Sequence, residues 1–164
     1  MMELIPGIRN AARALIIRQD QILLLRKEGG GRGERYALPG GAQDPGENLR
    51  DALNRECEEE IGTAVDIGEL LHVAEFFKLR DTQPPTRRHL VEFLFRCAVP
   101  GDYTPRNGYR PDKHQVEVVW ADMEALAGLP IFPRYLSTCI PNSRGGDRTH
   151  YLGTFEDHAT PEEH

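Results

Sequence analysis

The stretch that decides the fold of this chain is GAQDPGENLRDALNRECEEEIGT, from Gly41 to Thr63. Nothing between Leu49 and Ile61 breaks a helix, and apolar residues recur there at the spacing of one helix face. These apolar positions are Leu49, Ala52, Leu53, Cys57 and Ile61. The sequence therefore predicts a helix over residues 49–61 that packs one face against a core.

Two carboxylates lie on the apolar side of this predicted helix. Counting about 100° per residue from Leu49, Glu56 falls at roughly 340° and Glu60 at roughly 20°. Glu59 lies beside them at roughly 280°, whereas Glu58 points away at roughly 180° and is expected to be solvated. Buried like charges repel and take up protons unless a cation compensates them. Carboxylate oxygens from successive turns suit a hard divalent ion, so this face predicts a Mg²⁺ or Mn²⁺ site.

The fixed positions of the same stretch resemble the signature of the Nudix hydrolases, G-x5-E-x7-R-E-U-x-E-E-x-G-U, in which U is a bulky aliphatic residue. At roughly 6% usage for each residue type, a chance match to all the fixed positions is on the order of 10⁻⁹ to 10⁻⁸ per starting position. Cys57 and Thr63 replace aliphatic residues, and we interpret them as packing variants because both are compact. The matching residues are Gly41, Glu47, Arg55, Glu56, Glu59, Glu60 and Gly62.

This resemblance implies both a fold and a reaction. The fold is α/β, a Nudix-type α/β/α sandwich with a mixed β-sheet, in which the box lies on a strand–loop–helix. The reaction is metal-dependent pyrophosphohydrolysis, in which water cleaves the diphosphate bond of a nucleoside diphosphate-linked small molecule. The implied cofactor is Mg²⁺ (or Mn²⁺).

The resemblance also assigns roles to residues of the box. Arg55 is expected to orient the box through an ion pair with Glu47. Arg55, Glu56 and Glu59 are the expected catalytic residues, and either of the two glutamates is a candidate for accepting the proton from water. The implied metal ligands are the main-chain carbonyl of Gly41 and the side chains of Glu56, Glu59 and Glu60.

Candidates for a further acidic residue and for substrate contacts lie outside the box. Many family members recruit an acid ahead of the Trp-bearing strand, and here Glu117 is the first candidate and Asp112 the second. The loop 100–114 is interpreted either as a substrate-contacting loop or as simply solvent-exposed. Substrate-binding residues stay unassigned, because the basic residues of the loop equally suit solvent exposure and the other basic candidates better suit a surface charge. These candidates are Arg13, Arg35, Arg88, Arg106, Arg110 and Lys113.

The identity of the substrate is only weakly indicated. ADP-ribose-type members tend to carry a proline about fifteen residues past the box, and residues 76–79 contain none. Members that act on dinucleoside polyphosphates often carry a tyrosine slightly further on, and residues 79–83 contain none. A nucleoside triphosphate or a sugar nucleotide is therefore slightly favoured.

Outside the box, the sequence predicts a layered sheet. Residues 15–17 and 22–25 are continuous apolar runs around a turn, which indicates a hairpin covered on both faces. Residues 65–67, 70–77, 89–99 and 115–120 are expected to be strands. Short helices are expected from Asp122 and from Pro133 to about Ile140.

Length and composition indicate one small globular domain over residues 1–140, with a polar, partly flexible extension over 141–164. The net charge of −6 argues against binding to long nucleic acid. There is no apolar run long enough for a membrane and no leader-like start, so a cytoplasmic protein is expected. We expect the cysteines to be reduced thiols in the core. Residues 70–77 suit either a homodimer interface or the core.

Three functions other than hydrolysis fit the sequence less well. The alternative is a non-catalytic Nudix-fold nucleotide-binding regulator, but such chains usually have degraded boxes. Isomerisation of isopentenyl diphosphate needs a reactive cysteine in the site, and Cys57 on the apolar helix face is poorly placed for that role. A structural module would not need three carboxylates on a buried helix face.

Overall fold

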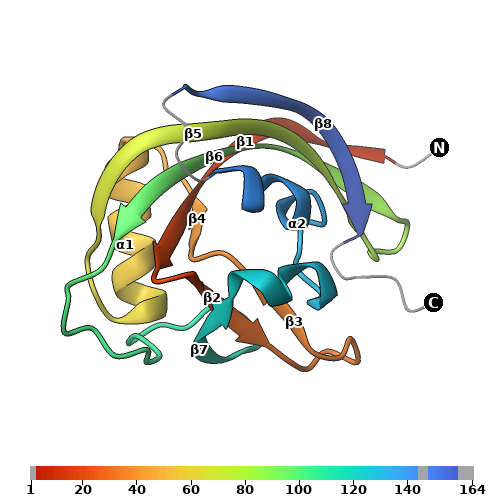
Figure 1. Ribbon diagram of the computed structural model, residues 1–164. Helices are drawn as coiled ribbons and strands as arrows, with labels where there is room; N and C mark the ends of the chain where they lie inside the picture. The colour runs from red at the N-terminus through yellow and green to blue at the C-terminus, as the bar shows by residue number, and fades with distance from the viewer. Residues whose placement is uncertain (1–2, 144–147, 159–164) are drawn as a thin grey trace.

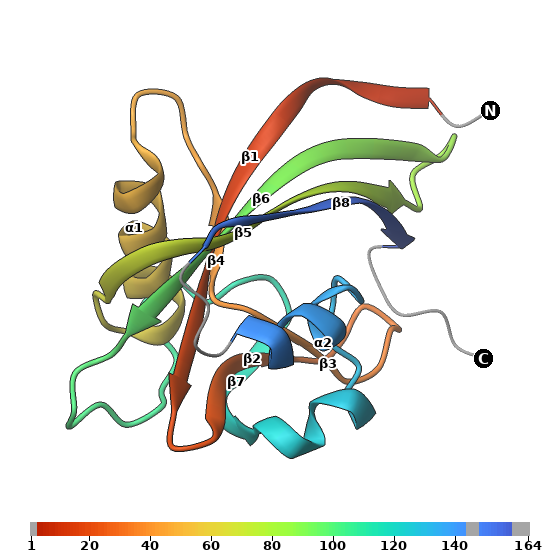
Figure 2. The same ribbon diagram turned by 45° about the horizontal axis from the view of Figure 1, so that its top comes forward.

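The structure is a computed structural model that describes residues 3–143 and 148–158. A strongly bent sheet arches over short helical segments, and a longer helix lies on its other side (Figures 1 and 2). The elements are β1 (Glu3–Arg18), β2 (Gln21–Lys27), β3 (Arg35–Ala37), β4 (Gly40–Ala42), α1 (Leu49–Ile61), β5 (Asp66–Arg80), β6 (Thr86–Ala98), β7 (Gln115–Asp122), η1 (Met123–Gly128), α2 (Leu136–Cys139), η2 (Pro141–Ser143) and β8 (His150–His158). The predicted α/β fold with a mixed sheet is confirmed.

The long strand β1 organises the sheet. The strand order is β3-β2-β1-β6-β5-β8, with β4 paired to β1 and β7 paired to β2. Most of β1 runs parallel to β6, and its last residues form the predicted hairpin with β2. Because β1 joins both parts of the sheet, the short strand β4 that leads into the box lies against the centre of the fold.

The apolar runs of the hairpin are buried on both faces, as predicted. Leu23 and Leu25 of β2 belong to a core cluster with α1, whereas Ile22 and Leu24 belong to a second cluster with η1 and α2. All three cysteines are free and buried, and Phe76 is buried as well. In the described ranges, no helix has the length and apolarity needed to span a bilayer.

Some elements differ from the predicted ones. The extended pieces 65–67 and 70–77 form one strand, β5, whose pairing with β6 is irregular around Leu70. The helix expected from Asp122 is a 3₁₀ helix, and the helix expected over 133–140 contains α2 as its regular turn. Strand β8 joins the sheet beside β5, and Phe155 stacks on Tyr135 with ring centroids 4.6 Å apart. Of the partly flexible extension expected over 141–164, residues 144–147 and 159–164 lie outside the described residues.

Helix α1 has the predicted bounds because both of its ends are fixed by hydrogen bonds. The side chain of Asn48 accepts a 2.8 Å bond from the amide of Asp51 and caps the first turn. Gly62 adopts a left-handed conformation and closes the last turn. Before the helix, Glu47 accepts bonds of 3.1 and 2.7 Å from Arg55, which is the predicted ion pair. The loop ahead of α1 is thereby tied to the middle of the helix.

Truncation of the interface between α1 and the sheet tests its contribution to stability. Leu53 is fully buried in the cluster that α1 shares with the sheet. We expect L53A to lower the free energy of unfolding by about 2–5 kcal/mol, from lost burial and a residual cavity. I8A, at a side chain that is 64% exposed, should change it by no more than about 0.5 kcal/mol. Urea unfolding followed by circular dichroism measures both, and equal losses would show that α1 docking does not limit stability.

The ion pair at the helix start predicts a pH-dependent stability. Bonds from Arg55 and from the amide of Asp44 lower the pKa of Glu47 from 4.5 to about 2. A carboxyl group with a lowered pKa stabilises the folded state above its unfolded pKa, and this contribution is lost as the pH falls through the folded value. The difference in unfolding free energy between wild type and E47Q should therefore be largest at neutral pH. It should decrease as the pH falls from 4.5 to about 2. The exposed Glu58 provides the control E58Q, which should match wild type throughout.

Candidate active site

The glycine turn ahead of the box meets the most deeply buried carboxylate of α1. The amide of Gly40 donates a 2.8 Å hydrogen bond to Oε1 of Glu60, a residue that is only 2% exposed. Burial raises the pKa of Glu60 to about 8. Neither glycine has room for a side chain: a Cβ on Gly40 would lie 2.1 Å from the carbonyl oxygen of Ala12, and one on Gly41 would lie 2.6 Å from Cδ of Glu56. The backbone thus reaches the carboxylates only because it carries glycine here.

Arg55 connects the remaining carboxylates of the box. Its Nη1 lies 3.1 Å from Glu56 and 3.5 Å from Glu59, while its other nitrogens bind Glu47. Arg55 also donates a 3.0 Å bond to the carbonyl of Ala42, which fixes the guanidinium against β4. Burial raises the pKa of Glu56, although Arg55 opposes that shift. Glu58, by contrast, is exposed as predicted.

The donors gathered at this turn suit a hard divalent cation. Glu56 and Glu60 are both held where burial favours their protonated forms, and a cation would reverse that preference. Carboxylate oxygens are the ligand type that Mg²⁺ and Mn²⁺ prefer. Within the described part of the chain, no three acidic, His or Cys side chains already surround one point, and Arg55 holds an oxygen each of Glu56 and Glu59. These residue types therefore fit a divalent metal ion. In the structure, the positive charge next to Glu56 and Glu59 is that of Arg55.

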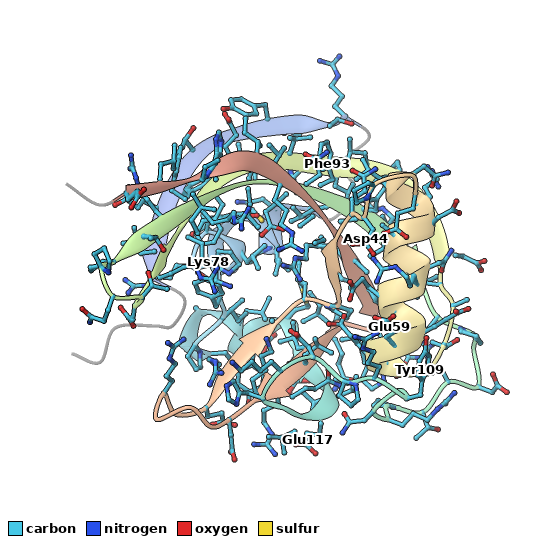
Figure 3. All side chains as sticks on the ribbon, turned by 180° about the vertical axis from the view of Figure 1, so that it is seen from behind. Asp44, Glu59, Lys78, Phe93, Tyr109 and Glu117 are labelled. Atoms are coloured by element: carbon cyan, nitrogen blue, oxygen red, sulfur yellow. The ribbon has the colours of Figure 1, made fainter. Side chains whose placement is uncertain are left out.

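A pocket of about 790 Å³ opens beside these carboxylates. It extends from the glycine turn along the concave face of the sheet. Figure 3 shows Lys78, which lines the pocket, beneath the curved strands, and Glu59, which lies outside the pocket lining, beside α1. The charged residues that line it are Arg9, Arg13, Lys27, Arg32, Arg35, Lys78, Arg80, Lys113, Glu56, Glu60, Asp81, Glu92 and Asp112. Basic residues outnumber acidic ones in this pocket although the whole chain carries a net charge of −6.

Of the arginines considered from the sequence, Arg13 is the most closely integrated with the glycine turn. It donates a 2.9 Å bond to the carbonyl of Gly40 and a 3.0 Å bond to Glu92, which is 2% exposed. Although burial opposes it, Glu92 raises the pKa of Arg13. Arg35 also lines the pocket, whereas Arg88 is absent from its lining. Arg13 thus holds the turn in place while facing the pocket.

The two candidates for an additional acid lie in different surroundings. Asp112 lines the pocket and its carboxylate lies 2.6 Å from Nζ of Lys27. Although burial opposes it, Lys27 lowers the pKa of Asp112. Glu117 is exposed and accepts a 2.7 Å bond from Arg26, and Figure 3 shows it at the margin of the molecule, away from Glu59. Geometry therefore brings Asp112, and not Glu117, to the pocket.

The loop 100–114 divides between the pocket and the outer surface. Lys113 and His114 at its end line the pocket. Arg106 donates a 2.6 Å bond to the carbonyl of Gly62 at the end of α1, and Arg110 lies outside the pocket lining. Within this loop, only the last residues are thus placed to contact a ligand in the pocket.

Lys78 and Glu92 are pocket residues that the sequence analysis did not single out. Glu92 lies between the buried Leu90 and Leu94 on one strand face, and Lys78 follows the buried Phe76 on the face that it shares with the exposed Arg80. A charge at a core-facing position of a strand was therefore the available signal. This signal was missed because the sequence analysis assigned strand faces from the alternation of apolar residues alone.

Comparison with known proteins shows the family of this chain. The family model described as NUDIX domain matches residues 7–138. A curated relative, the uncharacterised Nudix hydrolase YvcI of Bacillus subtilis (strain 168), is 27% identical over 127 residues, which cover 77% of this chain and 73% of the relative.

Solved structures share the fold. A NUDIX hydrolase from Nitrosomonas europaea superposes with a TM-score of 0.67 at 20% identity, covering 87% of this chain and 93% of the other. An ADP-ribose pyrophosphatase from Streptococcus suis 89-1591 superposes with a TM-score of 0.58 at 21% identity, covering 90% of this chain and 98% of the other. With the family match over most of its length, the chain belongs to the Nudix family and is a hydrolase of that family.

Proposed function

We propose that this protein is a metal-dependent pyrophosphohydrolase that cleaves the diphosphate bond of a nucleoside diphosphate-linked small molecule. The observation that carries the proposal is the meeting of Glu60 and Glu56 with the turn Gly40–Gly41 at one end of a cation-lined pocket. Family membership supports the same reaction class. The pocket is large enough for a nucleotide-sized ligand, and its basic lining suits phosphate groups.

The proposed metal ligands are the side chains of Glu56, Glu59 and Glu60 with the main-chain carbonyl of Gly41. When bound, Mg²⁺ or Mn²⁺ supplies neutralisation of the diphosphate and acidification of water. The water oxygen forms a bond to one phosphorus, the bridging P–O bond breaks, and the proton passes to Glu56 or Glu59. Arg55 contacts both of these glutamates and so orients whichever one accepts the proton.

Asp112 is proposed as the additional acid of the site, in the role that the sequence assigned first to Glu117. It lines the pocket next to Lys27, and its charge acts on both Glu60 and Arg13. A carboxylate with a lowered pKa stays ionised at neutral pH and is available to orient water or a cation. Glu117 lacks this position because β7 turns its side chain outward to Arg26.

The class of substrate remains that indicated by sequence, a nucleoside triphosphate or a sugar nucleotide. The Streptococcus suis structural relative is an ADP-ribose pyrophosphatase, so ADP-ribose is a necessary member of any test panel. The panel should also contain dinucleoside polyphosphates. For the nucleoside triphosphates, phosphate release after treatment with inorganic pyrophosphatase measures turnover. For ADP-ribose, the sugar nucleotides and the dinucleoside polyphosphates, phosphate release after treatment with a phosphatase measures it.

The matched pair E60Q and E58Q tests the metal site. Both replace a glutamate of α1 by its neutral isostere, but Glu60 is buried at the glycine turn and Glu58 is exposed. We expect E60Q to lose at least about a hundredfold of the metal-dependent turnover, because it removes a charged ligand. E58Q should retain wild-type turnover, and EDTA should abolish turnover of both wild type and E58Q.

Wild-type turnover by E60Q would contradict the assignment of the metal ligands. Absence of turnover across the whole panel, combined with tight binding of one compound, would instead support the nucleotide-binding regulator. Circular dichroism and thermal unfolding of E60Q confirm that a loss of turnover does not reflect loss of the fold.

A second pair, D112N and E117Q, tests the additional acid. We expect D112N to lower kcat by at least about tenfold, because the pocket loses an ionised carboxylate beside the reacting groups. E117Q should stay close to wild type, since Glu117 contacts Arg26 outside the pocket. The reverse ranking of the two variants would show that the strand acid, rather than the loop acid, serves the reaction.

A further inference from the structure

The pocket has a second basic wall, which lies along β1 and β5 beyond the level of Arg13 in the strand register. Arg9 of β1 and Lys78 and Arg80 of β5 line it. Strand pairing places them together, because Arg9 pairs with Leu90 of β6, and Leu90 pairs with Phe76, two residues before Lys78. We call Arg9, Lys78 and Arg80 the distal cations.

The distal cations differ from the other basic residues of the pocket in their partners. Arg13 is paired with Glu92, and Lys27 is paired with Asp112. Among the side chains that the structure describes, no carboxylate lies within ion-pair distance of a distal cation. Strand pairing sets Asp157 of β8 opposite Lys78, and the described carboxylates that line the pocket are paired with other cations or lie at the glycine turn.

Lys78 is the distal cation most affected by its surroundings. Burial, together with the charges of Arg13, Lys27 and Arg80, lowers its pKa to about 8. The nearest ring is that of Phe132, whose centroid lies 6.0 Å from Nζ. An ammonium group that is removed from water among other cations gains strongly from the arrival of an anion. Figure 3 shows the side chain of Lys78 beneath the curved strands, whereas Glu59 lies beside α1.

We propose that the distal cations bind a phosphate group that the substrate carries in addition to the diphosphate that is cleaved. Three cations on one wall match a dianionic phosphate better than a single carboxylate, and arginine provides forked donors for its oxygens. The wall lies on strands β1 and β5, whereas the cleaved diphosphate is assigned to the turn and α1. The inference rests on the proposed function, because it concerns the far end of the same substrate.

Matched substrate pairs test the distal phosphate. ADP-ribose is compared with its 2′-phosphate, and dephospho-coenzyme A is compared with coenzyme A. We expect the phosphorylated member of at least one pair to have a kcat/KM about ten to a hundred times higher, mainly through a lower KM. K78M should reduce this preference to near one, whereas K78R should retain most of it.

Two controls separate this effect from general changes. R110M removes a cation that lies outside the pocket lining and should keep the full preference. R80M provides a second variant of the wall and should also reduce the preference, so that misfolding of K78M would not end the test. A preference that is absent, or that survives both K78M and R80M, overturns the inference.

Binding measurements distinguish this proposal from the proposed function. Calorimetry of wild type and K78M with each pair in EDTA measures affinity without turnover. Tighter binding of the phosphorylated members by wild type, lost in K78M, supports the distal site even if no compound is hydrolysed. Metal-dependent hydrolysis with equal affinity for both members of each pair would keep the proposed function and refute the distal site.

Discussion

The hydrogen bond from the amide of Gly40 to Glu60 is the contact on which the rest of the site depends. It joins the first residue of β4 to the last turn of α1, and it does so in a place where the carboxylate is almost completely removed from water. A buried carboxylate is unfavourable unless it receives hydrogen bonds or meets a cation. The equally buried Glu92 meets the guanidinium of Arg13, whereas Glu60 is held by the amide of Gly40, which leaves its carboxylate suited to a cation.

The elements around this contact can be understood as its support. Arg13 holds the carbonyl of Gly40 from the sheet side, and Arg55 holds the carbonyl of Ala42 from the helix side. Each guanidinium is itself fixed by a carboxylate, Glu92 in the first case and Glu47 in the second. The turn is therefore clamped by two charged pairs that approach from opposite elements, and a group placed against it has a fixed backbone to face.

Local sequence signals predicted the box helix and the hairpin because these elements are determined by neighbouring residues. The bounds of α1 follow from apolar spacing and its end residues, and the apolar runs of β1 and β2 follow from burial on both faces. The carboxylate directions of Glu58 and Glu60 follow from helix geometry alone. These parts needed no knowledge of distant contacts.

The remaining parts depend on contacts between residues far apart in the chain. Asp112 reaches the pocket because its loop returns to Lys27, and Glu117 leaves it because β7 pairs with β2 in one particular register. Lys78 and Glu92 become pocket residues because β5 and β6 form part of the arch of the sheet and carry them on its inner face (Figure 1). No local pattern encodes those pairings, since a shift of one residue would reverse every side chain.

Strand β8 has one more consequence for the molecule. It pairs in parallel with β5 from His72 to Leu79 and so covers hydrogen-bonding groups that would otherwise form an open sheet edge. Open edges invite pairing with other chains. With β8 as the edge strand, β5 is paired on both sides, by β6 and by β8, and the strand that carries Lys78 and Arg80 is held within the sheet.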